Sequence, residues 1–137
     1  MNGCTKRTCL LLVTASIGMT VAQAEVVVIV NAKNPVASMT AAQVADVFLG
    51  KDSSLSPVDL PDSASQRSEF YTKVAGKDSA QVKAIWSRLV FTGKSQPPKE
   101  VASSADAVKQ VAGNEKGIAY VDKGAVDASV KAVLTVN

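Results

Sequence analysis

The sequence has no histidine, and its two cysteines, Cys4 and Cys9, both lie close to the N-terminus. These absences exclude histidine-based acid–base chemistry, cysteine nucleophiles farther along the chain and the common zinc sites. A serine–lysine pair or a carboxylate pair such as Asp59 and Asp62 stays compatible with the composition, but no catalytic motif or glycine-rich nucleotide loop accompanies either. We therefore expect a protein that is not an enzyme and that has no cofactor and no metal.

The sequence also lacks an apolar run long enough to cross a membrane. The longest candidate, Cys9 to Val21, has 13 residues, follows the basic pair Lys6 and Arg7, and precedes Ala22-Gln23-Ala24. A charged start, a short apolar stretch and a small-x-small site are typical of a cleaved secretory signal peptide. We expect residues 1–24 to be this signal and residues 25–137 to form a single domain in the periplasm that does not span the membrane.

An excess of one charge is missing as well. Without Lys6 and Arg7, the 15 basic residues fall to 13, which face 12 acidic residues and leave a net charge of +1. Nucleic-acid binding requires a concentrated basic surface, so we do not expect a nucleic-acid partner.

The pattern of apolar residues and helix caps predicts an α/β domain. Val26 to Val30 is an unbroken β-branched run, typical of a central strand that is buried on both faces. The periodic run around Trp86 predicts a helix whose core face carries Val82, Ile85, Trp86, Leu89 and Val90. The remaining segments predict, in order, a helix from Thr40 to Gly50, a strand at 57–60, a helix at 65–74, a helix from Ser103 or Ser104 to Val111, and strands at 117–122 and 130–136.

A hydroxyl-rich run at 62–67 follows the short predicted strand and opens the next helix. A helix start has unpaired N–H groups and the positive end of the helix dipole, and ligands of α/β proteins bind at the carboxyl ends of strands. These features predict an oxyanion site made by Ser63, Ala64, Ser65, Gln66 and Arg67. The alternative is helix capping without a ligand, because Ser63-x-x-Gln66 also fits a capping box.

Four segments of the chain resemble the phosphate-binding proteins of ABC-type phosphate transporters. They are Val30–Val36, Val44–Lys51, Asp62–Phe70 and Gly117–Val121, in the same order as in that family. Those proteins are two-lobed type II periplasmic binding proteins, and this chain looks like one lobe. The resemblance implies an α/β fold with a small mixed sheet and helices on both faces, and inorganic phosphate or a similar oxyanion as the ligand.

The family's Arg-x-x-x-Ser-Gly-Thr loop is only partly matched. Leu60 stands at the arginine position, Ala64 at the serine, Ser65 at the glycine and Gln66 at the threonine. Arg67, on the first turn of the helix, is expected to replace the missing arginine in part; alternatively, it is a surface residue paired with Asp62 or Glu69. Asp62 repels a dianion unless the ligand is protonated and donates a hydrogen bond to it.

Two functions follow from these features. The first is a phosphate-binding or oxyanion-binding module that is weak alone or is completed by a transporter, a partner protein or a second copy. The second is a module that has lost its ligand and docks a partner through an edge strand or a former lobe interface. The aromatic residues are expected to pack in the core or at its rim, with the Tyr120 hydroxyl at the edge of the core or at a ligand. They are Phe48, Phe70, Tyr71, Trp86, Phe91 and Tyr120.

Overall fold

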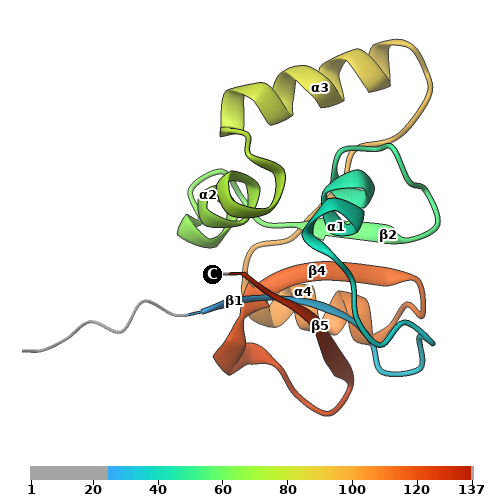
Figure 1. The fold of residues 1–137 in the computed structure, drawn as a ribbon, viewed down its shortest axis with the longest axis vertical. Helices are drawn as coiled ribbons and strands as arrows, with labels where there is room; N and C mark the ends of the chain where they lie inside the picture. The colour runs from blue at the N-terminus through green and yellow to red at the C-terminus, as the bar shows by residue number, and fades with distance from the viewer. Residues whose placement is uncertain (1–24, 137) are drawn as a thin grey trace, which may run out of the picture.

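The computed structural model describes residues 25–136, so the predicted signal peptide lies outside the described residues. A five-stranded sheet in the order β3-β2-β4-β1-β5 forms the centre (Figure 1). The elements are β1 (Val26–Asn31), α1 (Ala41–Phe48), β2 (Ser56–Asp59), α2 (Ser65–Phe70), the π-helix η1 (Tyr71–Ala75), α3 (Ser79–Phe91), β3 (Lys99–Glu100), α4 (Ser104–Ala112), β4 (Gly117–Asp122), the 3-10 helix η2 (Lys123–Ala125) and β5 (Val130–Val136).

Local sequence signals account for most of these boundaries. Thr40 and Asp78 form complete capping boxes at the starts of α1 and α3, and the Ser103 hydroxyl caps α4. The predicted strands and helices are confirmed, although the second half of the helix predicted at 65–74 is the π-helix η1. There are two additions, the strand β3 and the 3-10 helix η2, which have two and three residues and are too short to leave a periodic pattern.

The sheet is mixed. β1 pairs antiparallel with both β4 and β5, whereas β2 pairs parallel with both β3 and β4. The three neighbouring strands β3, β2 and β4 therefore end at the same edge of the sheet. This edge is where ligands bind in α/β folds.

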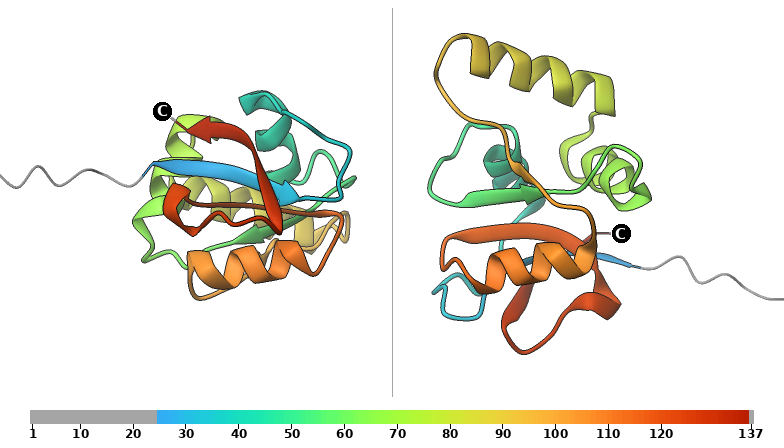
Figure 2. Two further views of the ribbon diagram at one scale, coloured as in Figure 1. Left: turned by 90° about the horizontal axis from the view of Figure 1, so that it is seen from below. Right: turned by 180° about the vertical axis from the view of Figure 1, so that it is seen from behind.

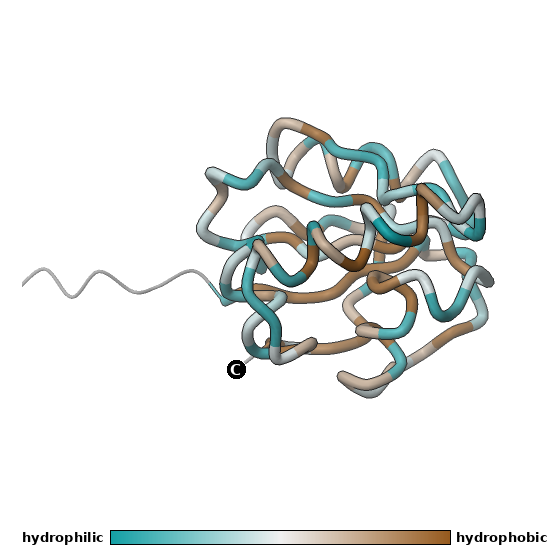
Figure 3. The backbone as a smooth tube through the Cα atoms, turned by 90° about the horizontal axis from the view of Figure 1, so that it is seen from above, coloured by the Kyte–Doolittle hydropathy of each residue, from teal (hydrophilic) through white to brown (hydrophobic). Residues whose placement is uncertain are grey.

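Helices cover both faces of the sheet, as expected for this α/β fold: α4 lies on one face and α1 with α2 on the other (Figure 2). The strands carry the most apolar backbone segments (Figure 3), and every residue of β1 is buried. An aromatic cluster fills the space under α1 and α2. The rings of Phe70 and Tyr120 stack at 4.2 Å, and Phe48 meets Phe70 edge-on at 4.8 Å.

Helix α3 lies apart from the sheet at one end of the molecule (Figure 1 and the right view of Figure 2). Val82 and Trp86 are buried, and the Trp86 indole donates a hydrogen bond of 3.0 Å to the carbonyl of Phe48. The expected core positions of Val90 and Phe91 are wrong, since Val90 is 50% exposed and Phe91 is 92% exposed. The last turn of α3 extends beyond the surface on which its first turns pack.

Among the described residues, no helix combines the length and the apolar character that crossing a membrane requires.

Gly50 closes the turn after α1 with a positive φ of 79°, and a Cβ there would lie 2.6 Å from Leu89 Cδ1. Gly50→Ala is therefore expected to lower the free energy of unfolding by roughly 2 to 4 kcal/mol, from backbone strain plus overlap. Gly76 also has positive φ, but open space surrounds it. Gly76→Ala should cost only about 1 kcal/mol. Urea denaturation of both variants measures the two losses in the free energy of unfolding. Equal losses would contradict the close packing of Gly50 against α3.

Candidate functional site

A hollow of about 370 Å³ lies beyond the carboxyl ends of the three parallel strands. Leu60 follows β2, Ala102 follows β3, and Asp122 ends β4. The starts of α2 and α4 complete the lining, with Ala64, Gln66, Ser103, Ser104 and Ala105. Two helix starts therefore meet at one sheet edge, which directs their first-turn N–H groups toward a shared space.

The first-turn amides differ in their hydrogen bonding. The amide of Ala64 donates to the carbonyl of Pro61 (2.9 Å), and that of Arg67 donates to the carbonyl of Ala64 (3.1 Å). Within residues 25–136, the amides of Ser65 and Gln66 have no acceptor. Of these two residues only Gln66 lines the hollow, and the acceptor-free amides of Ser104 and Ala105 at the start of α4 add two more.

A chain of side-chain hydrogen bonds ties the two helix starts together. Gln66 Nε2 donates to Asp122 Oδ2 (2.8 Å), and the Asp122 amide donates to Ser104 Oγ (3.3 Å). The other carboxylate oxygen, Asp122 Oδ1, is buried and has no hydrogen-bond donor in the described part of the chain. Neither Ser104 nor Asp122 was predicted as a site residue, because only the sheet brings them beside Gln66.

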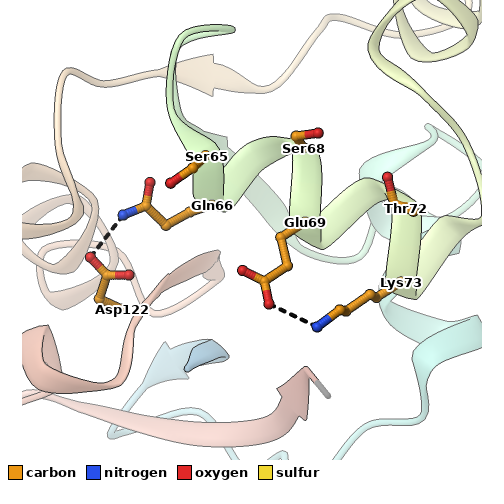
Figure 4. A pocket seen from close by; sticks show the side chains of 7 residues that line it. All are labelled: Ser65, Gln66, Ser68, Glu69, Thr72, Lys73 and Asp122. Atoms are coloured by element: carbon orange, nitrogen blue, oxygen red, sulfur yellow. Dashed lines mark hydrogen bonds and ion pairs between the residues drawn. The ribbon is translucent and has the colours of Figure 1, made fainter. Parts of the chain in front are cut away.

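The outer side of α2 carries a second hollow of about 500 Å³. It is rich in hydroxyl groups and carboxylates (Figure 4). Its one lysine, Lys73, is already paired with Glu69 at 2.9 Å, and of the helix starts in the described residues only that of α2 borders it. We therefore prefer the hollow that the starts of α2 and α4 both border. Its lining residues are Ser65, Gln66, Ser68, Glu69, Thr72, Lys73 and Asp122.

The sequence-predicted residues separate in the structure. Ser63 is exposed in the turn before α2, and Ser65 is exposed at the first position of the helix. Ala64 is the N-cap, without a side-chain cap hydrogen bond. The expected Ser63-x-x-Gln66 capping box is wrong, because the cap falls one residue later and the Gln66 amide group is turned to Asp122.

Arg67 points away from the hollow and is buried, with 9% exposure. Its Nη1 donates to the carbonyl of Leu60 (2.8 Å) and lies 3.2 Å from Asp59 Oδ2. Its Nε lies 3.2 Å from Asp62 Oδ1 without directing its N–H at that oxygen, so this contact is an ion pair and not a hydrogen bond. The pairing with Asp62 is confirmed, and the surface position is wrong.

The charges around Arg67 set two pKa shifts. Burial opposes the charge of Arg67, but the carboxylates of Asp59 and Asp62 outweigh it and raise its pKa. A hydrogen bond from Lys83, with the charge of Arg67 adding to it, lowers the pKa of Asp62 below its usual range. The positive charge that was expected to meet a ligand is thus already balanced by the protein's own carboxylates.

Asp59 is the buried acceptor of a hydrogen-bond network under the site. Tyr71 donates to its Oδ2 at 2.7 Å, and Tyr120 donates to its Oδ1. The Leu60 amide donates to both Asp59 Oδ1 (2.9 Å) and the Tyr120 hydroxyl (3.1 Å). The Tyr120 hydroxyl therefore faces the core interior and neither its edge nor a ligand. Burial, reinforced by the charge of Asp59, raises the pKa of both tyrosines far above the usual range.

No group of three or more potential metal ligands occurs among the described residues.

No protein-family model and no curated protein sequence matches this chain. Solved structures do match it. A Clostridium perfringens protein described as a phosphate ABC transporter substrate-binding protein, solved with bound phosphate, is 23% identical with a TM-score of 0.67. An ABC-type phosphate transport receptor from Vibrio cholerae is 20% identical with a TM-score of 0.62, and PstS from Borrelia burgdorferi is 10% identical with a TM-score of 0.61.

These matches cover 80% of this chain and 44 to 46% of the matched chains. The described residues therefore have the fold of one lobe of a type II periplasmic binding protein, and the chain spans less than half the length of the structures that it matches. The matched proteins are binding proteins rather than enzymes. At this level of identity the likeness shows the fold alone, so the ligand has to be argued from the site.

The two tyrosines of the chain, Tyr71 and Tyr120, provide a test of the buried network. Both should stay protonated above pH 10 as long as the protein is folded, because their pKa values are raised in the folded state. The unfolded chain releases these protons at about pH 10, so the free energy of unfolding should fall as the pH rises above that value. Absorbance at 295 nm should then appear together with loss of the circular dichroism signal. Tyrosinate absorbance that develops while the protein stays folded would contradict the network.

Proposed function

We propose that this chain is a binding-protein-like module that binds phosphate or a similar oxyanion at the hollow between the starts of α2 and α4. One observation carries the proposal: three first-turn amides with no acceptor among residues 25–136, those of Gln66, Ser104 and Ala105, belong to residues that line a hollow at the carboxyl ends of three parallel strands. Backbone amides at helix starts bind anions through hydrogen bonds and the helix dipole. The fold shared with phosphate-binding proteins supports the same class of ligand.

Asp122 favours a ligand that carries a proton. Its carboxylate lines the hollow, and a fully ionised anion beside it would be repelled. Hydrogen phosphate retains a proton that can be donated to a carboxylate, whereas sulfate at neutral pH does not. The site should therefore prefer phosphate to sulfate.

The binding is proposed to be weak in the isolated chain. A site open to solvent gains only about 0 to 1 kcal/mol from each charge-assisted contact. Even at about 1 kcal/mol each, three such contacts give an affinity weaker than roughly 1 mM, since that dissociation constant equals about 4 kcal/mol. Tight capture would need a second surface over the hollow, from a transporter, a partner protein or a second copy. We place this function in the periplasm, after removal of residues 1–24 as a signal peptide.

An amide NMR titration of the purified protein with phosphate tests the proposal. Sulfate and chloride at matched ionic strength serve as controls. We expect saturable, phosphate-selective shifts for the amides of Gln66, Ser104 and Ala105. An absence of shifts, or the same shifts with every salt, would refute the oxyanion site.

A proline substitution tests the amide donor itself. Ser104 is the first residue of α4, lines the hollow and follows Ser103, whose ψ of 167° is extended, so proline fits without disturbing the helix. Ser104→Pro and Ser104→Ala lose the same hydroxyl group, but only proline removes the N–H, so Ser104→Pro should bind phosphate about fivefold more weakly than Ser104→Ala. Ala41→Pro, at the first position of α1, is the matched control. Equal affinities for Ser104→Pro and Ser104→Ala would show that this amide does not bind the ligand.

A further inference from the structure

Helix α3 borders a groove of about 650 Å³, which is distinct from the proposed oxyanion hollow. Val82 and Trp86 line the groove from α3, and Asp59, Asp62 and Arg67 line it from the rest of the protein. Val82 and Trp86 are also the two buried residues among the 13 of this helix. Because most of its surface is free, α3 packs on the rest of the protein along one narrow face.

Few polar contacts attach α3 to other parts of the protein. The Trp86 indole donates a hydrogen bond to the carbonyl of Phe48 (3.0 Å), Lys83 pairs with Asp62, and Ser79 Oγ lies 3.5 Å from Asp62 Oδ1. In the described part of the chain, no other hydrogen bond or ion pair joins residues 79–91 to the residues before 78 or after 94. The Lys83–Asp62 pair is exposed on both sides, and such pairs are weak.

Both ends of α3 are capped by residues that adjoin it in the sequence. Asp78 forms the capping box at its start. At its end, the Thr92 hydroxyl donates to the carbonyl of Arg88 (3.0 Å), and the amide of Lys94 donates to the carbonyl of Leu89 (3.1 Å). The unpaired groups at helix ends are therefore satisfied locally, and the helix would lose no cap on leaving its position.

A glycine in the left-handed backbone conformation flanks α3 on each side. Gly76 has a φ of 64° and Gly93 a φ of 70°, and a Cβ at either position would meet no atom within 4 Å. Glycine adopts other backbone conformations at little cost, and these surroundings leave room for the change. Hinges are a few residues at the ends of elements that absorb changes in φ and ψ, and these two glycines fit that description.

We propose that residues 76–93 form a strap that opens as one unit about its two end glycines while the sheet stays folded. Opening breaks the contacts of Trp86 and Lys83. It leaves the buried network of Asp59 intact, because the members of that network belong to β2, α2, η1, β4 and the loop after β2. The open strap exposes its apolar face and the groove side of Arg67, so it controls access to the groove.

Labelling of buried thiols tests the strap, in a chain whose Cys4 and Cys9 are replaced by serine so that no other thiol remains. Val82→Cys places a thiol on the buried face of α3, and Val121→Cys makes the same change in the buried strand β4. With dithiobis-nitrobenzoate, Val82→Cys should react at least about 100-fold faster than Val121→Cys. Its rate should also rise less steeply with urea, because partial opening exposes less surface than global unfolding. Equal rates with equal urea dependence would overturn the proposal.

Two second-site variants show which contacts break on opening. Tyr71→Phe removes a hydrogen bond to Asp59 that opening leaves intact. It should therefore speed labelling of Val121→Cys at least about tenfold and that of Val82→Cys less than about twofold. Lys83→Gln, with rates normalised to those in urea, should speed labelling of Val82→Cys about threefold. An equal effect of Tyr71→Phe on both thiols would show that α3 opens only when the core unfolds, and would overturn the strap.

Two further thiols complete the test. Val27→Cys, buried in β1, should be labelled as slowly as Val121→Cys, and it takes the place of that variant if Val121→Cys does not fold. Ser87→Cys, exposed on α3, should be labelled without any opening. Labelling of Val82→Cys as fast as that of Ser87→Cys in the absence of urea would show that α3 is not docked at rest, and it would overturn the proposal as well.

Discussion

The buried carboxylate of Asp59 is the charge around which the site end of the sheet is organised. An unpaired ion at this depth would cost several kcal/mol, so its partners must be held in place. Tyr71, Tyr120, the Leu60 amide and the Arg67 guanidinium surround it, and they come from α2, η1, β4 and the loop after β2. Through these contacts, one carboxylate fixes how the loop leaves β2 and therefore where α2 begins.

This arrangement explains why no basic side chain lines the hollow. Arg67 balances Asp59 and Asp62 and holds the carbonyl of Leu60, and it is therefore not available to a ligand. What remains at the hollow are backbone amides, hydroxyl groups and the carboxylate of Asp122. Such a site can recognise an oxyanion only weakly. On the other side of the turn before α2, Asp62 lies beside Lys83, so the Asp59 network also borders the groove beside α3.

The fold could be predicted from local signals because those signals agree with one another. Capping boxes at Thr40 and Asp78, the β-branched run of β1 and the glycine stops are short-range features that tertiary contacts did not override. Long-range features were predicted less well. The periodicity of α3 indicates which residues could face a core, but not where the core ends, so Val90 and Phe91 were misplaced. The run at 62–67 indicated a helix start, but not its cap or the direction of Arg67.

The sequence by itself determined the α/β class, the order of its elements and the absence of histidine or cysteine chemistry in residues 25–136, because composition and short-range periodicity specify these features. Only the tertiary structure decided what the site contains. Asp59 and Tyr120 lie 61 residues apart, and Gln66 and Asp122 lie 56 residues apart, yet each pair is hydrogen-bonded. No local pattern encodes such pairs, since the parallel packing of β2 against β4 creates them.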